Sequence, residues 1–525
     1  MFSVSKMTLI PLSLYFVVFC ILTFPLICRF SSHFFCDMGD GLQNVWNMWW
    51  VNKAVTQLHT SPWYTTYLHY PYGTSLQGQT LNVFNGFMGI VLLKFMSLVQ
   101  AHNFIVIFSF VMGGLTAFFL AHYLTESYWG SITAGCVFTF SNYHFAHAEG
   151  HLQLVSLEWL PLFMLCVFIL INRPSIIMAA ASAAALFAVI LCDYYYFLFC
   201  LISTLLILIW RVMQPGGLAE IVKRSSLVPL VVFAVAVISS SGVIVFALLS
   251  LNEYDPLLGA HNPEEFSSDL LAPFIPGGHW RFAELTKAYW SKLPGNIHES
   301  SVFVGLAVIS LLVWTWVRRN ESRVKNVNLW YSLLLIFFVL SLGPVLHIWG
   351  VAFPRIIMPY SLCETLLPFL RLSGCPVRMM VMVTLFSAVI CAAGFKTFFE
   401  GRPGVRMVLI SWLLVLVLEY VPKPIPSSQV QVPKYVEVLK GLPDARGVID
   451  LAASESLGLY YQTVHERPMA FGYTSRTPTS VRQRDLEIMA LLKLREIGRL
   501  RREYKFDYLI CVPPNETSEM IYRLP

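Results

Sequence analysis

The sequence predicts an all-α polytopic membrane protein with about eleven transmembrane helices, followed by a small C-terminal α/β domain. Three observations lead to this prediction. Of the 525 residues, 56% are hydrophobic and 13% are charged, and the mean hydropathy is +0.64, whereas about a quarter of the residues of a soluble domain are charged. The apolar residues occur in blocks that are long enough to cross a bilayer. A polar segment of mixed helix and strand character follows residue 422.

The apolar blocks define the candidate spans. The first block follows Lys6 and has a longer apolar core than a cleaved signal peptide, so we expect it to remain in the chain. The candidate spans are residues 8–28, 104–122, 130–146, 152–171, 175–192, 194–212, 226–250, 300–316, 329–350, 376–395 and 405–422. A further block, residues 81–98, is interrupted by Lys94, two glycines and two asparagines. We expect this block to form an interfacial or re-entrant helix that does not cross the membrane.

The distribution of Lys and Arg predicts the orientation of the chain. Three connectors are rich in positive charge and should be cytoplasmic, namely residues 211–224, 317–325 and 396–406. Counting from these connectors places the N-terminus inside. The segments predicted to lie outside are residues 30–103, 141–151, 251–299 and 423–525. This count holds only if residues 81–98 do not cross.

The chain divides into two predicted domains. Residues 1–422 form the membrane domain, and residues 423–525 form an extracytoplasmic soluble α/β domain. The polar tail opens with a proline-rich linker, VPKPIPSS. It continues with a helix-like KYVEVLKGL, a strand-like GVIDL, a basic helix over about residues 481–503 and a strand-like YLICV.

Two carboxylates end the first apolar block. Asp37 and Asp40 are three residues apart, so they lie on the same side of a helical turn. Such a pair can share a divalent cation such as Mg²⁺ or Mn²⁺, or one acid can act as a base that the other orients. Acids that simply face water at the end of a span fit the spacing equally well. The next residues, Trp46, Trp49, Trp50 and Lys53, repeat at i, i+3, i+4 and i+7, which predicts a helix in the headgroup layer beside the acids.

A second polar cluster lies in the predicted external turn SNYHFAHAEGHLQ. His144, His147 and His151 share one face of a helix, and Glu149 lies among them. Imidazoles beside a carboxylate are typical metal ligands or proton carriers. An ordinary polar turn between two spans remains the alternative.

Four further residues are weaker candidates for substrate binding. Asp193 lies between two spans, where an acid is costly unless it has a function. Glu299 opens a span, although a helix N-terminus favours an acid in any case. Arg371 and Arg378 flank the external start of another span and suit a phosphate, as they would suit a lipid headgroup.

Several blocks of the sequence resemble bacterial polytopic proteins of the GT-C glycosyltransferase superfamily. These blocks are GDGLQNVWNMWW, HYPYGTSLQGQT, FTFSNYHFAHAEGHLQLVSLEWLPL, RLSGCPVRMMVMV and YYQTVHERPMAFGYTSR. The resemblance implies that an acidic motif in the first external loop serves as catalytic base or metal ligand. Asp40 takes this position and Asp37 a supporting one. The turn 141–151 corresponds to a second catalytic loop, in which this chain has histidines and Glu149 where many GT-C enzymes have an Asp.

The predicted function is therefore transfer of a sugar from a polyprenyl-phosphate donor to an extracytoplasmic acceptor, with inversion at the anomeric carbon. The acceptor is a glycan or another cell-envelope molecule, the location is the cell membrane, and no nucleic acid is involved. Two alternatives stay open. One is a transporter or flippase of a lipid-linked glycan, for which inverted repeats would be expected and none is evident. The other is a non-catalytic assembly subunit that keeps the GT-C fold.

Overall fold

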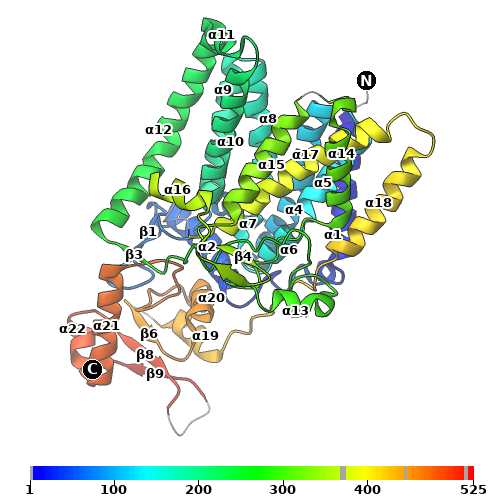
Figure 1. Cartoon of the computed structure of the whole chain (residues 1–525). Coiled ribbons are helices and arrows are strands. Elements are labelled where there is room, and N and C mark those ends of the chain that lie inside the picture. The colour runs from blue at the N-terminus through cyan, green and yellow to red at the C-terminus, as the bar shows by residue number, and fades with distance from the viewer. Residues whose placement is uncertain (1–3, 325, 367–373, 443–445, 514–517) are drawn as a thin grey trace.

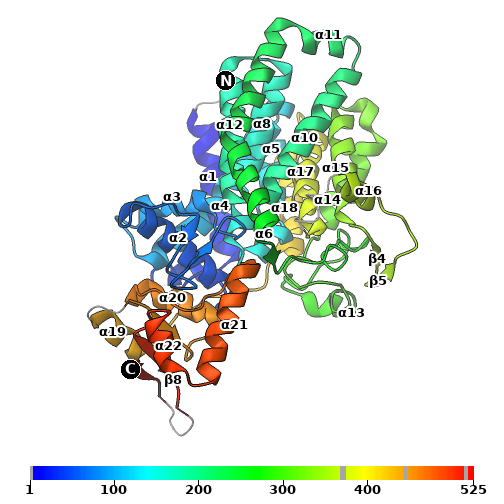
Figure 2. The same ribbon diagram turned by 90° about the vertical axis from the view of Figure 1, so that its left-hand side faces the viewer.

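The computed structural model describes residues 4–324, 326–366, 374–442, 446–513 and 518–525. Helices run side by side in a bundle, and the C-terminal segment lies against one end of it (Figure 1). The view turned by 90° shows the same arrangement, with α11 at the end opposite to the C-terminal segment (Figure 2).

Every predicted span overlaps a helix. The α-helices before residue 421 are α1 (Val4–Leu22), α2 (Asp40–Thr56), α3 (Val83–Leu92), α4 (Leu98–Thr125), α5 (Tyr128–Thr139), α6 (Asn142–His147), α7 (Leu152–Val155), α8 (Trp159–Asn172), α9 (Ile176–Cys192), α10 (Tyr194–Met213), α11 (Gly217–Val222), α12 (Arg224–Tyr254), α13 (Lys287–Trp290), α14 (Leu306–Val317), α15 (Val327–Ser341), α16 (Pro359–Leu366), α17 (Met380–Phe398) and α18 (Val405–Tyr420). Short 3₁₀ helices are η1 (Leu26–Arg29), η2 (Ala283–Thr286), η3 (Arg319–Glu321) and η5 (Pro376–Met379).

The helices differ in what surrounds them. Within the described residues, four helical segments are long and apolar enough to cross a membrane: α4, α10, α12 and Pro376–Phe398. The apolar window of Pro376–Phe398 is 100% buried, whereas that of α12 is 11% buried. A helix that is apolar on all sides is either enclosed by protein or surrounded by lipid. Residues 376–398 therefore form the centre of the bundle, and α12 suits contact with lipid. The number of helices that cross the membrane stays a prediction.

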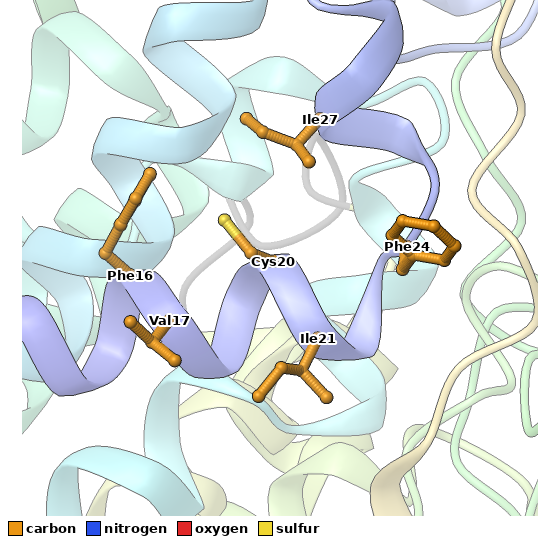
Figure 3. A pocket seen from close by; sticks show the side chains of 6 residues that line it. All are labelled: Phe16, Val17, Cys20, Ile21, Phe24 and Ile27. Carbon is orange, nitrogen blue, oxygen red and sulfur yellow. The ribbon is translucent and has the colours of Figure 1, made fainter.

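An apolar hollow of about 460 Å³ lies along α1. Figure 3 shows its lining side chains on α1 and on the segment that follows it, namely Phe16, Val17, Cys20, Ile21, Phe24 and Ile27. Phe24 and Ile21 are 71% and 68% exposed. Apolar side chains left open on the outside of a bundle suit lipid acyl chains better than water.

The segments predicted to lie outside gather at one end of the bundle. Phe34 of the first loop pairs with Ser428 of the tail in a β-bridge, and β3 (Leu257–Leu258) pairs antiparallel with β7 (Thr477–Pro478). At the opposite end, the connector residue Arg323 donates its backbone N–H to Thr397 Oγ1 at 3.4 Å. The two groups of segments, one at each end of the bundle, are those that the positions of Lys and Arg predicted. The side of the membrane that each end faces stays a prediction.

The block 81–98 forms a helix that is too short to cross a bilayer upright. At 1.5 Å per residue, the 10 residues of α3 span about 15 Å, half of a hydrocarbon core. Two glycines let α3 lie on α2. A Cβ atom at Gly86 would come within 2.6 Å of Val51, and one at Gly89 within 2.5 Å of Met48. This geometry agrees with the expected non-spanning helix.

The tryptophan stripe forms the predicted helix, α2, but it does not face lipid headgroups. Trp46, Trp49 and Trp50 are buried in the protein. Trp46 Nε1 donates to Gln462 Oε1 at 2.7 Å, and Lys53 Nζ lies 2.6 Å from Glu466 Oε2. The stripe therefore packs against the tail. The sequence pattern did not indicate this partner, because an apolar helix face does not specify what covers it.

The tail is a small α/β unit with the predicted order of elements. Its elements are α19 (Lys434–Gly441), β6 (Val448–Asp450), α20 (Glu455–His465), α21 (Thr479–Lys493), α22 (Ile497–Arg502), β8 (Tyr508–Cys511) and β9 (Met520–Arg523). The sheet order is β6-β8-β9, with β6 and β8 parallel and β8 and β9 antiparallel. The predicted basic helix 481–503 is divided into α21 and α22. Two further hairpins, β1 (Tyr64–Thr65) with β2 (Thr74–Ser75) and β4 (Leu346–Ile348) with β5 (Val351–Phe353), lie in the loops.

Candidate functional site

The first carboxylate of the acidic pair holds the start of α2. Asp37 Oδ1 accepts hydrogen bonds from the backbone N–H groups of Gly39 and Gly41, both at 2.9 Å. Backbone N–H groups at a helix start have no partner within the helix, so Asp37 acts as a cap. The histidine turn approaches closely, because a Cβ atom at Gly150 would lie 2.8 Å from Asp37 Oδ2.

The second carboxylate, Asp40, is the first residue of α2 and contacts two other parts of the chain. Its Oδ2 lies 3.1 Å from His151 Nε2, and its Oδ1 accepts a hydrogen bond from the Tyr473 hydroxyl at 2.7 Å. The side chain remains 37% exposed. Burial raises the pKa of Asp40, but the hydrogen bond and charge of His151 and the hydrogen bond from Tyr473 outweigh it, so the pKa is lowered. Asp40 is therefore an accessible carboxylate.

A row of polar side chains, in which one contact is longer than a hydrogen bond, leads from Asp40 into the bundle. His151 Nδ1 lies 2.9 Å from His147 Nδ1, and His147 Nε2 lies 3.7 Å from Glu299 Oε2. Glu299 Oε1 accepts hydrogen bonds from Arg378 Nε at 3.0 Å and from Arg378 Nη2. His147, Glu299 and Arg378 are buried. The structure thus brings together five residues that the sequence analysis selected separately.

Burial and the neighbouring charges determine which of these polar side chains are ionised. Burial would raise the pKa of Glu299, but the charge of Arg378, together with the hydrogen bonds that it donates, holds the pKa well below its usual range. Burial also lowers the pKa of His147, which keeps this imidazole neutral. Glu299 and Arg378 therefore form a buried ion pair, and His147 connects it to His151.

The remaining candidates fall in different places. His144 is stacked on Phe110 at 3.7 Å between ring centroids, and its two ring nitrogens face the carbonyl oxygens of Thr139 and Val155. It braces the α5–α7 region and does not join the polar side chains beside Asp40, because both of its ring nitrogens face backbone carbonyl groups. Arg371 lies outside the described residues.

Asp193 caps a helix at the edge of a cavity. Its Oδ1 accepts hydrogen bonds from the backbone N–H groups of Tyr195 and Tyr196, at the start of α10. Burial raises the pKa of Asp193 to about 6, although the charge of Arg378 opposes this shift. The acid is thus explained by helix capping, and it also lines the cavity described next.

The cavity beside Arg378 has a volume of about 330 Å³. One side is apolar and is formed by side chains of α10 and α12, among them Leu198, Leu201, Ile244, Val245 and Leu248. The other side carries Asp193, Tyr195, His261, Arg378 and Arg476. The Arg378 guanidinium lies 4.6 Å from the centre of the Tyr195 ring, and Arg476 Nη2 donates to the Tyr195 hydroxyl at 3.3 Å. An apolar wall thus meets two arginines.

Two groups of side chains have the spacing of metal ligands within the described part of the chain. They are His147, His151 and Glu299, and Glu149, His279 and His298. The ligand atoms of each group lie within 4.8 Å of one another. Neither group includes Asp37 or Asp40, so a Mg²⁺ or Mn²⁺ site at the acidic pair stays a prediction. The imidazole ligands of the two groups suit zinc better than these ions.

Sequence reasoning missed the residues that distant loops and the tail supply. Tyr473 and Arg476 come from the tail, and His261, His279 and His298 come from the loop 251–299. The block YYQTVHERPMAFGYTSR was among those that carried the family resemblance, and it ends with both tail residues. This was the one signal that pointed to the tail as part of the site.

A family described as a domain of unknown function (DUF6311) matches residues 84–418, which is more than half of the chain. The chain belongs to this family. Within this DUF6311 protein the matched range contains the histidine turn, Glu299 and Arg378, whereas Asp40 and the tail lie outside it. No curated protein matches the chain.

Solved structures that are similar to this DUF6311 chain include those of AftD, AglB and ArnT. The arabinofuranosyltransferase AftD from mycobacteria has a TM-score of 0.58 and 11% identity, over 95% of this chain and 36% of AftD. The oligosaccharyltransferase AglB from Archaeoglobus fulgidus, in complex with an inhibitory peptide and a dolichol-phosphate, has a TM-score of 0.42 and 12% identity, over 88% of this chain and 64% of AglB. ArnT from Cupriavidus metallidurans, bound to undecaprenyl phosphate, has a TM-score of 0.42 and 10% identity, over 95% of this chain and 73% of ArnT.

The similarity to AftD shows the fold of this DUF6311 protein and nothing finer, because the identity is so low. It agrees with the GT-C fold that the sequence resemblance implied. The TM-scores of AglB and ArnT are too low to carry an argument. The chain spans less than two thirds of the length of AglB and about a third of AftD.

Proposed function

We propose that this protein is a membrane glycosyltransferase that moves a sugar from a polyprenyl-phosphate donor to an extracytoplasmic acceptor. The observation that carries the proposal is the connection of two features. An accessible carboxylate, Asp40, is linked through His151, His147 and Glu299 to Arg378. Arg378 in turn lines a cavity with an apolar wall. Acid–base chemistry and recognition of a lipid phosphate are therefore available in one connected site.

The cavity suits the donor. Arg378 and Arg476 offer planar guanidinium groups, which bind phosphate through paired N–H donors. Glu299 fixes the orientation of Arg378, since two nitrogens of the guanidinium donate to the same carboxylate oxygen. The apolar wall from α10 and α12 would accommodate the first isoprene units of the lipid. The sugar would then project from the phosphate towards the end of the bundle that carries Asp40.

The reaction is a direct displacement at the anomeric carbon. An oxygen of an acceptor hydroxyl forms a bond to this carbon, while the bond between the carbon and the donor phosphate oxygen breaks. The phosphate leaves with the electron pair, and the two arginines stabilise its added charge. Asp40 takes the hydroxyl proton, for which general-base catalysis typically contributes about 100- to 10,000-fold. Displacement by this route inverts the configuration of the sugar.

Both predicted domains would contribute to the site. Tyr473 holds one oxygen of Asp40, and Arg476 lines the cavity. The tail would therefore complete the active site in addition to packing against it. The proposal places this end of the bundle outside the cell membrane, where the acceptor is a glycan or another cell-envelope molecule.

Binding of undecaprenyl phosphate to the purified protein in detergent tests the donor site. Arg476→Gln should weaken this binding at least tenfold. The matched control is Arg482→Gln, because Arg482 is an exposed arginine of α21 that does not line the cavity. Equal binding by both variants would contradict the donor site.

Sugar transfer from a panel of polyprenyl-phosphate sugars tests the reaction. The wild type should transfer a sugar from one of these donors, and Asp40→Asn should lower the rate of transfer by about 100- to 10,000-fold. Translocation of the lipid-linked glycan in proteoliposomes, without transfer in any assay, would favour the transporter alternative. Failure of both activities would favour an assembly subunit.

A further inference from the structure

A second cluster of polar side chains joins the histidine turn to the loop 251–299. Glu149 comes from the turn, and His279 and His298 lie 19 residues apart in the loop. His279 Nδ1 lies 2.7 Å from Glu149 Oε1, and His298 Nδ1 lies 3.8 Å from Glu149 Oε2. The two imidazole rings are 4.8 Å apart between centroids. The three side chains therefore converge on one point.

The hydrogen bonds within the described residues leave this cluster incomplete. His279 is 5% exposed, and its Nε2 has no hydrogen-bond partner in this part of the structure. A neutral imidazole has one N–H donor and one acceptor nitrogen. If Nδ1 carries the hydrogen, the lone pair of Nε2 is buried without a donor. If Nε2 carries it, the lone pair of Nδ1 faces the Glu149 carboxylate. In this second tautomer a nitrogen lone pair and a carboxylate face each other at 2.7 Å, and a cation bound by both would remove this conflict.

We propose that Glu149, His279 and His298 bind a zinc ion. Two imidazoles and one carboxylate form a ligand set that zinc prefers, with a fourth position left for water or another ligand. In a tetrahedral site, ligand atoms at zinc-bond distances are about 3.4 Å apart. The two contacts of the Glu149 carboxylate, 2.7 Å at Oε1 and 3.8 Å at Oε2, lie on either side of this spacing. Small movements of the side chains would therefore bring one carboxylate oxygen and both imidazoles around an ion.

Glycines make the convergence of these segments possible. A Cβ atom at Gly278, next to His279, would come within 2.2 Å of Ile297, next to His298. A Cβ atom at Gly277 would lie 2.9 Å from Ser301 Oγ. Glycine, which has no side chain, therefore occupies the positions at which the segments around His279 and His298 approach each other most closely.

The site would fasten the catalytic loops to one another. Glu149 also accepts, through its carbonyl oxygen, the backbone N–H of Asp37 at 2.6 Å, and the carbonyl oxygen of His279 accepts the backbone N–H of Lys423 at 2.8 Å. Zinc bound here would connect the start of α2, the histidine turn, the loop 251–299 and the linker to the tail. The inference does not depend on the proposed transferase activity.

Metal analysis of the purified full-length protein in detergent tests the site. We expect the wild type to bind about one zinc ion per chain, as three protein ligands suffice for a site. Glu149→Gln, His279→Gln and His298→Gln should each weaken zinc binding by more than the roughly 10- to 100-fold that the loss of an outer-shell partner costs. His261→Gln, in the same loop, should retain the zinc.

Cobalt substitution gives a second readout that needs no variant. Co²⁺ bound to imidazole and carboxylate ligands absorbs in the visible range without the near-ultraviolet bands of thiolate ligands, which separates this site from the cysteines. Three results would overturn the proposal: a wild type that does not bind added Zn²⁺, thiolate bands in the cobalt spectrum, or loss of zinc in His147→Gln but not in the three ligand variants. Asp40→Asn should keep its zinc, so failure of the transferase proposal would be visible separately.

Discussion

The buried ion pair between Glu299 and Arg378 predicts a specific pattern of stability. The two side chains are 3% and 6% exposed, and two guanidinium nitrogens donate to one carboxylate oxygen. Removing one partner of such a pair leaves a charge buried without compensation, which typically costs about 3–5 kcal/mol. We expect Glu299→Gln and Arg378→Met each to lower the free energy of unfolding by about this amount.

The double variant distinguishes a charge effect from a packing effect. Replacing both partners by residues of similar volume removes the uncompensated charge, and this is often neutral or even stabilising. Glu299→Gln combined with Arg378→Met should therefore be more stable than either single variant. The two single losses would then be strongly non-additive, as expected for side chains in direct contact.

Denaturant unfolding in detergent, followed by tryptophan fluorescence, measures this pattern. The exposed pair Arg318–Glu321 is the matched control, because its side chains are 55% and 58% exposed. Arg318→Met should have a far smaller effect, since exposed ion pairs contribute little. If the double variant loses the sum of the two single losses, the charges do not compensate each other and the reasoning is wrong.

Three further predictions follow from other parts of the structure. Asp40→Asn should lower the rate of sugar transfer about 100- to 10,000-fold with unchanged affinity for undecaprenyl phosphate, whereas Asp37→Ala should mainly destabilise the start of α2, by about 1 kcal/mol in unfolding measurements. Burial, and then the charge of Arg467, lowers the pKa of His465 to about 3. The unfolded chain binds a proton at His465 below about pH 6.5, whereas the folded chain does not until about pH 3. The free energy of unfolding of the tail should therefore fall by up to about 1.4 kcal/mol per pH unit between about pH 6 and pH 4. His465→Gln should reduce this slope. A cysteine introduced at Asn320 should react with an impermeant reagent from the cytoplasmic side only.

Much of the fold could be predicted because its signals are local. Each apolar block became a helix, and the interruptions at Gly86 and Gly89 marked the short α3. The order of elements in the tail followed from short stretches of helix and strand character. The partner of the tryptophan stripe could not be predicted in this way. Periodicity shows that a helix face will be covered, but not by which part of the chain. Gln462, which accepts the hydrogen bond from Trp46, lies 416 residues further along the sequence.

The candidate site likewise contains residues with a local signal in the sequence and residues without one. Asp40, the histidine turn and Glu299 were found because they place polar groups where apolar residues are expected. Tyr473 is 433 residues from Asp40, and no local pattern links the two. His279 and His298 likewise look like ordinary loop residues until folding brings them to Glu149. Local spacing also misplaced His144: it shares α6 with His147, but its ring faces the carbonyl groups of Thr139 and Val155, which spacing alone does not show.

The contrast between Asp37 and Asp40 explains why the histidine turn should matter for turnover. Asp37 is committed to backbone amides, so Asp40 is the accessible acid. The hydrogen bonds that keep Asp40 ionised also lower its pKa, and a lower pKa makes a carboxylate a weaker base. The contact with His151 Nε2 also fixes the direction of the Asp40 carboxylate, and His147 holds His151 in turn, with 2.9 Å between the two Nδ1 atoms. Loss of either histidine should consequently slow transfer while leaving the donor cavity and its affinity for undecaprenyl phosphate intact.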